Sequence, residues 1–260
     1  MICRRNSYHG GSSSMMAATS HHTWKFPQQL NSGFHHAVCP DPYRSPFSGT
    51  PEEIATKSAN EVREIIRYST PGGIAAFMAE PIQGVGGATQ GAANYLREAY
   101  AHAGAVSNTC IADEVQTGFG RTGEHYWGFR TGGQGLDIRH HGQGIGNGAP
   151  LAPRRHDPAR DRREADAAHP LQHLRATPSP WPASATPQVI DDEGIQGKAK
   201  SIGGRLEGGL EDLQRRHRRI GDVRGRGLML GVELVKDRGT RRPPRRRRWP
   251  SRSTCASSAS

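Results

Sequence analysis

The chain is poor in the residues that build a hydrophobic core. Of its 260 residues, 33% are hydrophobic and 6% are aromatic. This length is enough for one or two domains, so we expect a core that is thin for the size of the chain. No apolar run approaches the roughly 20 residues of a membrane-spanning helix, and the stretch Met1–Gly10 is too short and polar for a signal peptide. We therefore expect no membrane partner.

Cysteine is also scarce, with four residues at positions 3, 39, 110 and 255. They have neither the spacing of a zinc site nor the density of a disulfide framework. The sequence therefore predicts no metal site and is compatible with a reducing compartment.

Acidic residues are outnumbered by basic ones, and the formal net charge of +11 is concentrated in two windows. Residues 139–183 contain seven Arg and four acids, and residues 241–260 contain seven Arg and no acid. The run RRPPRRRRWP is of a kind found in proteins that bind nucleic acid or acidic membranes. One hypothesis is therefore a noncatalytic, basic RNA- or DNA-binding protein, although the tail lacks the interleaved aromatic residues that stack on bases.

The most informative stretch is TCIADEVQTGFGRTG, residues 109–123. Residues 110–112 form a short apolar run that ends at the carboxylates Asp113 and Glu114, which predicts a buried strand leading into a loop. In α/β sheets, ligands bind at the carboxyl ends of the strands. From the residues alone, this acid pair is a metal ligand, a catalytic acid or a solvated turn.

A second strand is predicted at residues 73–78, and it also ends near a carboxylate, Glu80 in the string AEPIQG. Residues 95–102 predict the crossover helix between this strand and the one that begins after Thr109. Two such units place their strands in parallel and favour an α/β fold. Glu80 is then either part of a ligand site or a cap for the next helix.

Two further helices are predicted. One begins at Pro51, because Thr50 is a good N-cap and Glu53 completes a capping box. The other follows from apolar residues that step by three and four along one stripe. In the first helix, Ile54, Val62, Ile65 and Ile66 would face the core. The stripe of the second helix consists of Ile195, Ala199, Ile202, Leu206, Leu210 and Leu213. Its glycines each cost roughly 1 kcal/mol relative to alanine, so we expect tertiary packing to support this helix.

Three strings, IADEVQTGFGRTG, AEPIQG and the YHG of residues 8–10, resemble the cofactor segments of class III (ω-type) pyridoxal-phosphate aminotransferases. The segments TWKFP and HHAVCPDPYRSPFSG resemble the substrate-side loops of the alanine:glyoxylate aminotransferase branch. The resemblance implies a fold-type I large domain, with a mostly parallel sheet and flanking helices, and an incomplete small α+β domain. It also implies pyridoxal 5′-phosphate as cofactor and amino-group transfer from an alanine-like amino acid to a glyoxylate-like 2-oxo acid.

The resemblance assigns roles to individual residues. Asp113 would face the pyridine nitrogen of the cofactor and keep it protonated, so that the ring can accept electrons. Val115 would pack on the ring, Gln116 would hydrogen-bond the ring hydroxyl, and Tyr8 would stack on the ring. Glu80 would join the hydrogen-bond network on the Asp113 side. The implied cofactor-binding residues are Tyr8, His9, Glu80, Asp113, Val115 and Gln116.

The substrate carboxylate has its own expected partner. In the string VRGRGL, Arg224 occupies the position that the resemblance assigns to a carboxylate clamp, for which a planar guanidinium is suited. Arg226 is the less favoured candidate.

The catalytic lysine of the family is missing. The family string ends in Ala-Lys-Gly-Ile-Gly-Asn-Gly, and this chain has Gly142 and Gln143 before Gly-Ile-Gly-Asn-Gly. Gln143 therefore stands where the resemblance requires the lysine that bonds to the cofactor. An amide is neither nucleophilic nor basic, so we expect the chain as written to be inactive.

A change of reading frame accounts for this position. Residues 139–143 can be encoded so that a one-base shift reads Val-Thr-Met-Ala followed by Lys or Asn, as in the family. Shifted frames at residues 170–175 and 252–260 likewise yield strings that resemble a phosphate-contact motif and a small-domain helix. GC-rich DNA read out of frame gives Arg, Pro, Ala and Ser, so this interpretation also favours an artefact over a nucleic-acid patch.

The resemblance also predicts domain boundaries. A partial cofactor-binding domain would cover residues 1–150, and a disordered, out-of-frame segment would cover 151–187. A partial small domain would follow at 188–237, and a basic disordered tail at 238–260. The phosphate loop of the family should precede Arg5, so we expect an amino-truncated fragment. The intact family member is expected to be a mitochondrial homodimer.

Overall fold

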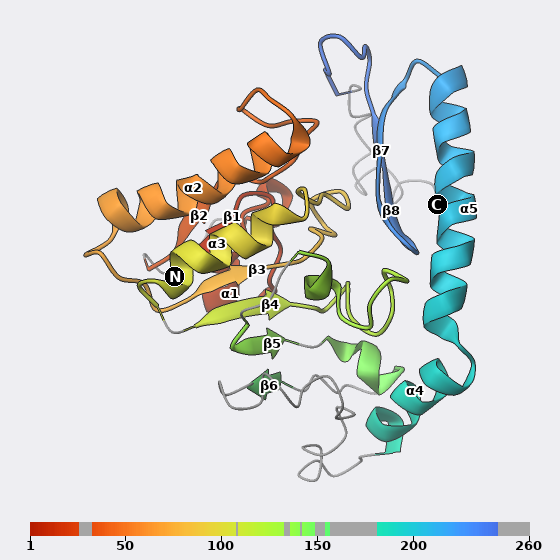
Figure 1. Cartoon of the computed structure of the whole chain (residues 1–260), viewed down its shortest axis with the longest axis horizontal. Coiled ribbons are helices and arrows are strands. Elements are labelled where there is room, and N and C mark those ends of the chain that lie inside the picture. Colours follow the sequence, from red (N-terminus) through yellow and green to blue (C-terminus); the bar gives the residue numbers. More distant parts are fainter. Residues whose placement is uncertain are drawn as a thin grey trace, which may run out of the picture.

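The computed structural model describes residues 1–25, 33–107, 109–132, 136–140, 142–148, 154–156 and 181–243. Within these ranges it describes the side chains of all residues except 143, 154–156 and 181–184. The described chain forms an α/β body around one sheet, with a helix and a β-hairpin beside it (Figure 1).

The sheet body has six strands in the order β2-β1-β3-β4-β5-β6. Strands β1 to β5 are parallel to their neighbours, and β6 runs antiparallel to β5. The carboxyl ends of the parallel strands therefore gather at one edge, where α/β folds hold ligands. This confirms the predicted α/β class with a mostly parallel sheet. The strands are β1 (Ile2–Arg4), β2 (His35–Ala37), β3 (Phe77–Ala79), β4 (Cys110–Asp113), β5 (Ile138–His140) and β6 (Arg154–His156).

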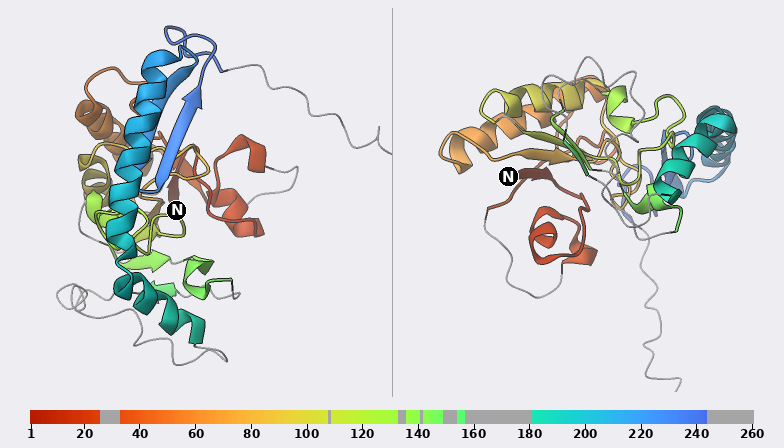
Figure 2. Two further views of the ribbon diagram at one scale, coloured as in Figure 1. Left: turned by 90° about the vertical axis from the view of Figure 1, so that its right-hand side faces the viewer. Right: turned by 90° about the horizontal axis from the view of Figure 1, so that it is seen from below.

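Helices cover both faces of the sheet. Helices α2 (Pro51–Ser69) and α3 (Asn94–Gly104) lie on one face, and the short helix α1 (Ser13–Ala18) lies on the other (Figures 1 and 2). Three short 3-10 helices, η1 (His22–Trp24), η2 (Gly128–Thr131) and η3 (Gln143–Gly146), lie in the connections.

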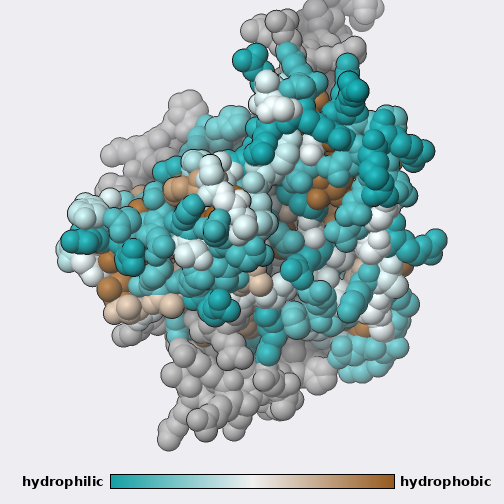
Figure 3. Space-filling view, turned by 45° about the horizontal axis from the view of Figure 1, so that its top comes forward, coloured by the Kyte–Doolittle hydropathy of each residue, from teal (hydrophilic) through white to brown (hydrophobic). Residues whose placement is uncertain are grey.

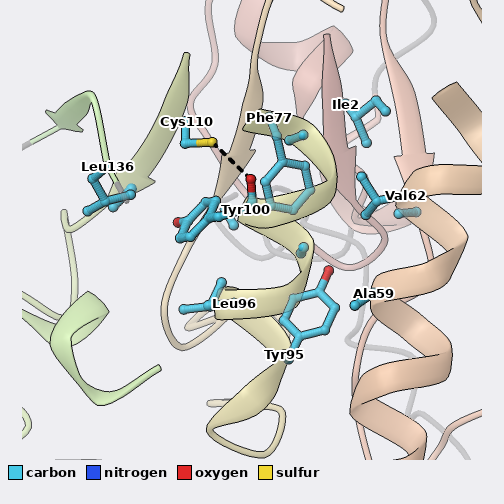
Figure 4. Close-up of a cluster of buried hydrophobic side chains, with 14 of the residues drawn as sticks. Ile2, Ala59, Val62, Phe77, Tyr95, Leu96, Tyr100, Cys110 and Leu136 are labelled. Carbon is cyan, nitrogen blue, oxygen red and sulfur yellow. Dashed lines mark hydrogen bonds between the residues drawn. The ribbon is translucent and has the colours of Figure 1, made fainter. Parts of the chain in front are cut away.

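The main core lies between the sheet and the pair α2 and α3. Tyr95, Leu96 and Tyr100 of α3 lie against Phe77 of β3 in this cluster, where the rings of Phe77 and Tyr100 meet edge to face at 5.6 Å (Figure 4). Aromatic side chains contribute much of the buried area here, since each covers a large surface. Phe77, Tyr95 and Tyr100 thus support the sheet at β3.

The start of α2 confirms the predicted capping box. The N–H of Glu53 donates to Thr50 Oγ1 at 3.2 Å, and the N–H of Thr50 donates to Glu53 Oε2 at 2.9 Å. Two N–H groups that have no partner inside the helix are thereby satisfied. The expected core face is also confirmed: Ile54, Val62 and Ile66 are buried, and Ile65 packs against the core.

The crossover unit is confirmed, with one shorter strand. Helix α3 covers the predicted residues 95–102 and joins β3 to the parallel strand β4. The strand predicted at residues 73–78 is limited to Phe77–Ala79. Its neighbours β1 and β4 are themselves short, so the chain before Phe77 has no strand to pair with.

A second unit follows the sheet body. Helix α4 (Trp181–Asp192) leads into α5 (Ile195–Arg216), which is followed by the antiparallel strands β7 (Ile220–Arg226) and β8 (Met229–Leu234). We call α5, β7 and β8 the hairpin unit; α5 runs along the hairpin (Figure 2). A Cβ atom on Gly203 of α5 would lie 2.3 Å from the carbonyl oxygen of Gly227, so only glycine allows this approach.

The apolar stripe of α5 is helical as predicted, but most of it is not buried. Ala199 is buried, whereas Ile202 and Leu206 are 51% and 49% exposed. A two-stranded hairpin is narrow, so it covers the helix only around Ala199 and Gly203. Tertiary packing against the hairpin therefore supports only this part of the helix.

The segment expected to be disordered, residues 151–187, contains regular structure at both ends. Strand β6 pairs with β5, and α4 begins at Trp181. Strand β6 and the first residues of α4 therefore differ from the expected disorder. Backbone pairing explains β6, because a strand at a sheet edge needs N–H and C=O groups more than particular side chains. The rest of this segment and the chain from residue 244 lie outside the described residues.

The surface is mainly polar on the face seen in Figure 3, with apolar side chains in small separate groups. No helix in the described part of the chain is both long enough and apolar enough to cross a membrane.

Candidate active site

A buried histidine and aspartate pair lies at the carboxyl end of β4. His9 Nδ1 and Asp113 Oδ2 are 2.7 Å apart, and their side chains are 0% and 4% exposed. The other Asp113 oxygen, Oδ1, accepts the Val115 N–H at 3.2 Å. Because an ionised carboxylate only accepts hydrogen bonds, Nδ1 of His9 carries the proton when Asp113 is charged. The structure thus brings together two residues that are 104 positions apart in the sequence.

The second ring nitrogen of His9 is left free for a ligand or water. Nε2 is buried and has no hydrogen-bond partner among the described residues. The backbone N–H of His9 donates to Thr19 Oγ1 at 3.0 Å, which fixes the residue from the other side. An unpaired buried nitrogen costs about 1–3 kcal/mol, so a partner at Nε2 would be stabilising.

Glu80 lies at the end of β3, beside this pair. Its Oε1 accepts the Tyr8 N–H at 2.9 Å, and its Oε2 accepts the Gly84 N–H at 3.1 Å. Burial raises the pKa of Glu80; the nearby His9 opposes this rise, and Asp113 adds to it. Glu80 therefore connects the turn after β1 to the turn after β3, next to the histidine and aspartate pair.

Tyr8 contributes its backbone as well as its ring. Its ring is half-buried and packs against Trp24, with the ring centroids 5.0 Å apart and the planes tilted by 55°. The ring role that the resemblance assigns to Tyr8 stays a prediction.

Glu114, the second acid of the pair, has a structural environment. It is 0% exposed, and its oxygens accept the hydroxyl of Thr117 at 2.6 Å and the N–H groups of Gly128 and Phe129 at 2.9 and 2.7 Å. Burial raises its pKa, and these three hydrogen bonds oppose the rise. The sequence left open whether this acid is a metal ligand, a catalytic acid or part of a solvated turn. In the structure Glu114 has none of these roles, because its hydrogen bonds connect the loop after β4 to η2.

The residues after β4 turn toward two different neighbours. Val115 is half-buried against Gly142, where a Cβ atom would lie 2.7 Å from Val115 Cγ1. Gln116 is exposed, and its amide lies over Gly84, where a Cβ atom would be 1.8 Å from Gln116 Oε1. The two glycines allow the three loops to meet at this edge of the sheet.

Gln143 begins η3, directly after Gly142. Since Gly142 contacts Val115, the backbone of residue 143 lies close to the loop that follows Asp113. The side chain of Gln143 is outside the described part of the structure, so its role stays a prediction.

A cavity of about 450 Å³ lies between the sheet body and the hairpin. Gln116 and Gly84 line it on the body side, and Arg224 and residues 228–234 line it on the hairpin side. Two residues of the predicted site therefore share this cavity, while His9, Glu80 and Asp113 are buried below the surface.

Arg224 is already engaged on three sides. Its Nε donates to the carbonyl of Gly87 at 2.9 Å, and its terminal nitrogens contact Asp222 at 2.8 Å and Glu233 at 2.6 Å. A substrate carboxylate would compete with these two acids for the guanidinium. In this geometry Arg224 fastens the hairpin to the loop after β3, so its role as a substrate clamp stays a prediction. Arg226 is also paired, with Glu124 at 2.5 Å.

Some features of the site were not predictable from local sequence. The contact of His9 with Asp113 and the bond from Arg224 to the carbonyl of Gly87 both join segments whose partners no spacing rule identifies. The sequence after Glu114 did contain a weak indication of its role. Threonine, glycine and aromatic residues follow it closely, which is typical of a tight loop whose N–H groups need a hydrogen-bond acceptor.

The residues present fit the ring of a pyridoxal cofactor, though not its covalent attachment. A buried carboxylate, oriented by a histidine, is suited to a protonated ring nitrogen. Val115 offers an apolar contact, and Gln116 offers an amide. Position 143 holds an amide in place of an amine.

This chain belongs to the class III aminotransferase family, whose characteristic sequence it matches over residues 1–245. Family members are generally pyridoxal-phosphate-dependent enzymes. The chain is 41% identical over 243 residues to alanine–glyoxylate aminotransferase 2 homolog 2, mitochondrial, of Arabidopsis thaliana, covering 94% of this chain and 50% of that protein. It is 33% identical over 262 residues to alanine–glyoxylate aminotransferase 2, mitochondrial, of Homo sapiens, covering 94% and 51%.

Solved structures agree on the fold. A Bacillus anthracis aminotransferase superposes with a TM-score of 0.80 at 28% identity, covering 94% of this chain and 56% of that one. A thermostable omega transaminase variant from Pseudomonas jessenii gives a TM-score of 0.81 at 29% identity, with the same coverage. The described sheet is therefore part of a fold-type I aminotransferase fold. The chain spans about half the length of the curated relatives it matches.

Proposed function

We propose that this chain carries the cofactor-ring side of a transaminase that moves an amino group from an alanine-like amino acid to a glyoxylate-like 2-oxo acid. The observation that carries the proposal is the buried hydrogen bond between His9 and Asp113 at the carboxyl end of β4. The names of the curated relatives support the choice of substrates.

Pyridoxal phosphate, when bound, supplies an electron sink for the carbanion that forms when an amino acid loses its α-proton. Asp113 would accept a hydrogen bond from the protonated pyridine nitrogen. His9 Nδ1 lies 2.7 Å from Asp113 Oδ2, and this hydrogen bond fixes the orientation of the carboxylate. These two residues would thus hold the proton at the ring nitrogen.

The surrounding residues would position the ring. Val115 and Tyr8 would contact its two faces, and Gln116 would bond the ring hydroxyl. Glu80 would hold the Tyr8 backbone in place through the hydrogen bond already described. Arg224 remains the proposed carboxylate clamp, and it would have to exchange Asp222 or Glu233 for the substrate.

Gln143 limits what the chain can do. Transamination needs a group that attaches the cofactor and carries the α-proton between two carbon atoms, and a glutamine amide does neither. We therefore propose that the chain as written does not turn over, and that lysine at this position would restore both steps in a chain of the length of its relatives.

The partners and the compartment follow from the relatives. We propose a homodimer, because class III aminotransferases are generally dimeric, and a mitochondrial location, because the Arabidopsis thaliana and Homo sapiens relatives are named mitochondrial. The nucleic-acid alternative receives no support from the described residues. Arg139, the first arginine of the basic window, is 3% exposed and lies over the rings of Trp127 and Phe129. Most of the other basic residues in the two windows lie outside the described part.

The test compares the chain with its Gln143→Lys variant, using Gln143→Met as a matched control without an amine. Each is incubated with pyridoxal phosphate, reduced with borohydride and digested. We expect a cofactor-modified peptide containing residue 143 only in the lysine variant. The same substitutions in a full-length, frame-corrected protein should give alanine and glyoxylate turnover with lysine and negligible turnover with glutamine. Equal turnover by both would contradict the proposal.

A second readout does not need the cofactor. The Nδ1 proton of His9 should give a downfield proton resonance in the cofactor-free protein, because it is held by a buried carboxylate. Asp113→Asn should shift or remove this resonance. An unchanged resonance would show that His9 and Asp113 are not paired in solution.

A further inference from the structure

A small cavity of about 30 Å³ lies where β1, the start of α3 and η2 meet. Arg4, Tyr95 and Thr131 line it, together with residues 90–93 and Arg226. About 10–15 Å³ is the minimum for one water molecule, so this space suits a water or one monatomic ion. It is too small for a phosphate or a substrate.

Arg4 brings a buried positive charge without a direct ion-pair partner to this cavity. It is 1% exposed, its terminal nitrogen donates to the carbonyl of Glu80, and its guanidinium lies over the ring of Tyr95. Its Nε has no hydrogen-bond partner, and no carboxylate among the described residues lies within ion-pair distance of Arg4, although the buried Glu80 carboxylate attracts it from further away. A buried cation without a direct partner is destabilising, because more distant attraction offsets its desolvation only in part.

The second arginine does not change this balance. Arg226 is paired with Glu124 at 2.5 Å, and its Nε donates to Gln90 at 3.3 Å. Arg226 therefore closes the cavity with its charge largely neutralised, and Arg4 remains the unpaired cation.

The start of α3 adds a second, independent source of positive potential. Its N-cap residue, Ala93, has no side chain that can accept from the helix, and the first turn contains no acidic residue. Gly91, Ala92, Ala93 and Leu96 form part of the cavity wall. An uncapped helix N-terminus favours an anion. The hydroxyl of Thr131 is buried and has no partner among the described residues, so it can donate as well.

We propose that this cavity binds a chloride-sized monovalent anion between Arg4 and the N-terminus of α3. A water molecule would satisfy the hydrogen bonds, but it would leave Arg4 without a direct counterion. The anion would also reach the active-site edge indirectly, since Arg4 bonds the backbone of Glu80, whose carboxylate holds Tyr8. The inference does not depend on the proposed transaminase function.

The experiment measures thermal unfolding of the whole chain in sodium chloride and in sodium gluconate at equal ionic strength. Gluconate is too large for the cavity, so the difference reports on the site and not on charge screening. We expect the unfolding midpoint to rise by about 3–6 °C at saturating chloride. The ³⁵Cl resonance of free chloride should also broaden in the presence of the protein.

Two arginine variants give a matched comparison. Arg4→Met keeps the length of the buried side chain without its charge, whereas Arg5→Met removes a neighbouring arginine whose side chain is 57% exposed. We expect the chloride dependence to disappear in the first and to persist in the second. Equal midpoints of the unmodified chain in both salts would show that the cavity holds only water, and a chloride effect that persists in Arg4→Met would place the anion elsewhere.

A third variant covers the case in which Arg4→Met does not fold. Thr131→Val retains Arg4 and removes one hydrogen-bond donor to the anion. The chloride concentration that gives half of the stabilising effect should therefore be several-fold higher in this variant. Unchanged ³⁵Cl broadening by Thr131→Val would overturn the proposed position of the anion.

Discussion

The sheet body and the hairpin unit are held together by different forces. The body buries Phe77, Tyr95 and Tyr100 between the sheet and two helices. The hairpin unit leaves Ile202 and Leu206 about half exposed. It contacts the body through one small apolar cluster of Ile82, Ala88 and Met229, and also through charged side chains. At that contact Glu233 accepts from both Arg44 and Arg224.

This difference indicates which region sets the stability of the chain. Burial of apolar area supplies most of the folding free energy, whereas exposed and partly exposed ion pairs supply little. Helix α5 also contains Gly204, Gly208 and Gly209, each of which costs roughly 1 kcal/mol relative to alanine. We therefore expect the body to unfold last and the hairpin unit to open first.

The largest expected effect is in the core of the body. Phe77→Ala should lower the free energy of unfolding by about 3–5 kcal/mol, because it removes a buried ring and leaves a cavity. Phe77→Leu is the matched control and should cost much less. Chemical denaturation followed by circular dichroism measures both losses of unfolding free energy. A smaller loss in Phe77→Ala than in Phe77→Leu would contradict the location of the core.

The next effect concerns the buried carboxylate of the site. Glu114→Ala should cost about 3 kcal/mol, since the N–H groups of Gly128 and Phe129 lose their acceptors. Thr117→Val, which removes a single donor to Glu114, should cost less. Denaturation midpoints of the two variants test the order.

The cost of Glu114→Ala should also depend on pH. Burial raises the folded-state pKa of Glu114 above its ordinary value of 4.5. For a raised pKa, the stabilisation is complete below the unfolded value and falls as the pH rises through the folded one. The difference in unfolding free energy between the unmodified chain and Glu114→Ala should therefore be larger near pH 4 than near pH 7. A difference that grows with pH would mean that hydrogen bonding lowers this pKa in the folded state.

A smaller effect is expected at the contact between the two regions. Arg224→Met should cost about 1 kcal/mol in local stability, because Asp222 loses its partner and Glu233 retains only Arg44. Hydrogen exchange should accelerate at the amides of β7 and β8 and remain unchanged in β3 and β4. In Arg224→Lys the exchange rates of these amides should lie between those of the unmodified chain and of Arg224→Met, since an ammonium group cannot bond both acids with the same geometry. Unchanged exchange in Arg224→Met would favour a pure substrate role.

The smallest effect is expected on the exposed stripe. Leu206→Ser should change the free energy of unfolding by less than about 0.5 kcal/mol, apart from a small loss of helix propensity. The same substitution at Leu96, in the core, is the comparison. A large cost at Leu206 would show that another surface covers this stripe.

Local patterns predicted the elements of the body well. The capping box at Thr50 and Glu53 and the crossover helix after Gly91 depend on neighbouring residues, so sequence was sufficient. Strand β6 and the start of α4 were not predicted, because the sequence there has no apolar period. The apolar stripe of α5 was predicted and its exposure was not, since periodicity shows that a helix has an apolar face and not what covers that face.

The sequence by itself determined the α/β class, the family and the identity of the side chains at the ends of β3 and β4, including the glutamine at position 143. These follow from short strings and local periods that need no knowledge of distant contacts. Only the tertiary structure decided that His9 bonds Asp113, that Glu114 ties a loop to η2, and that Arg4 is buried beside an uncapped helix. Each of these depends on which segments meet in space, and burial there changes the cost of a charge or an unpaired hydrogen-bonding group.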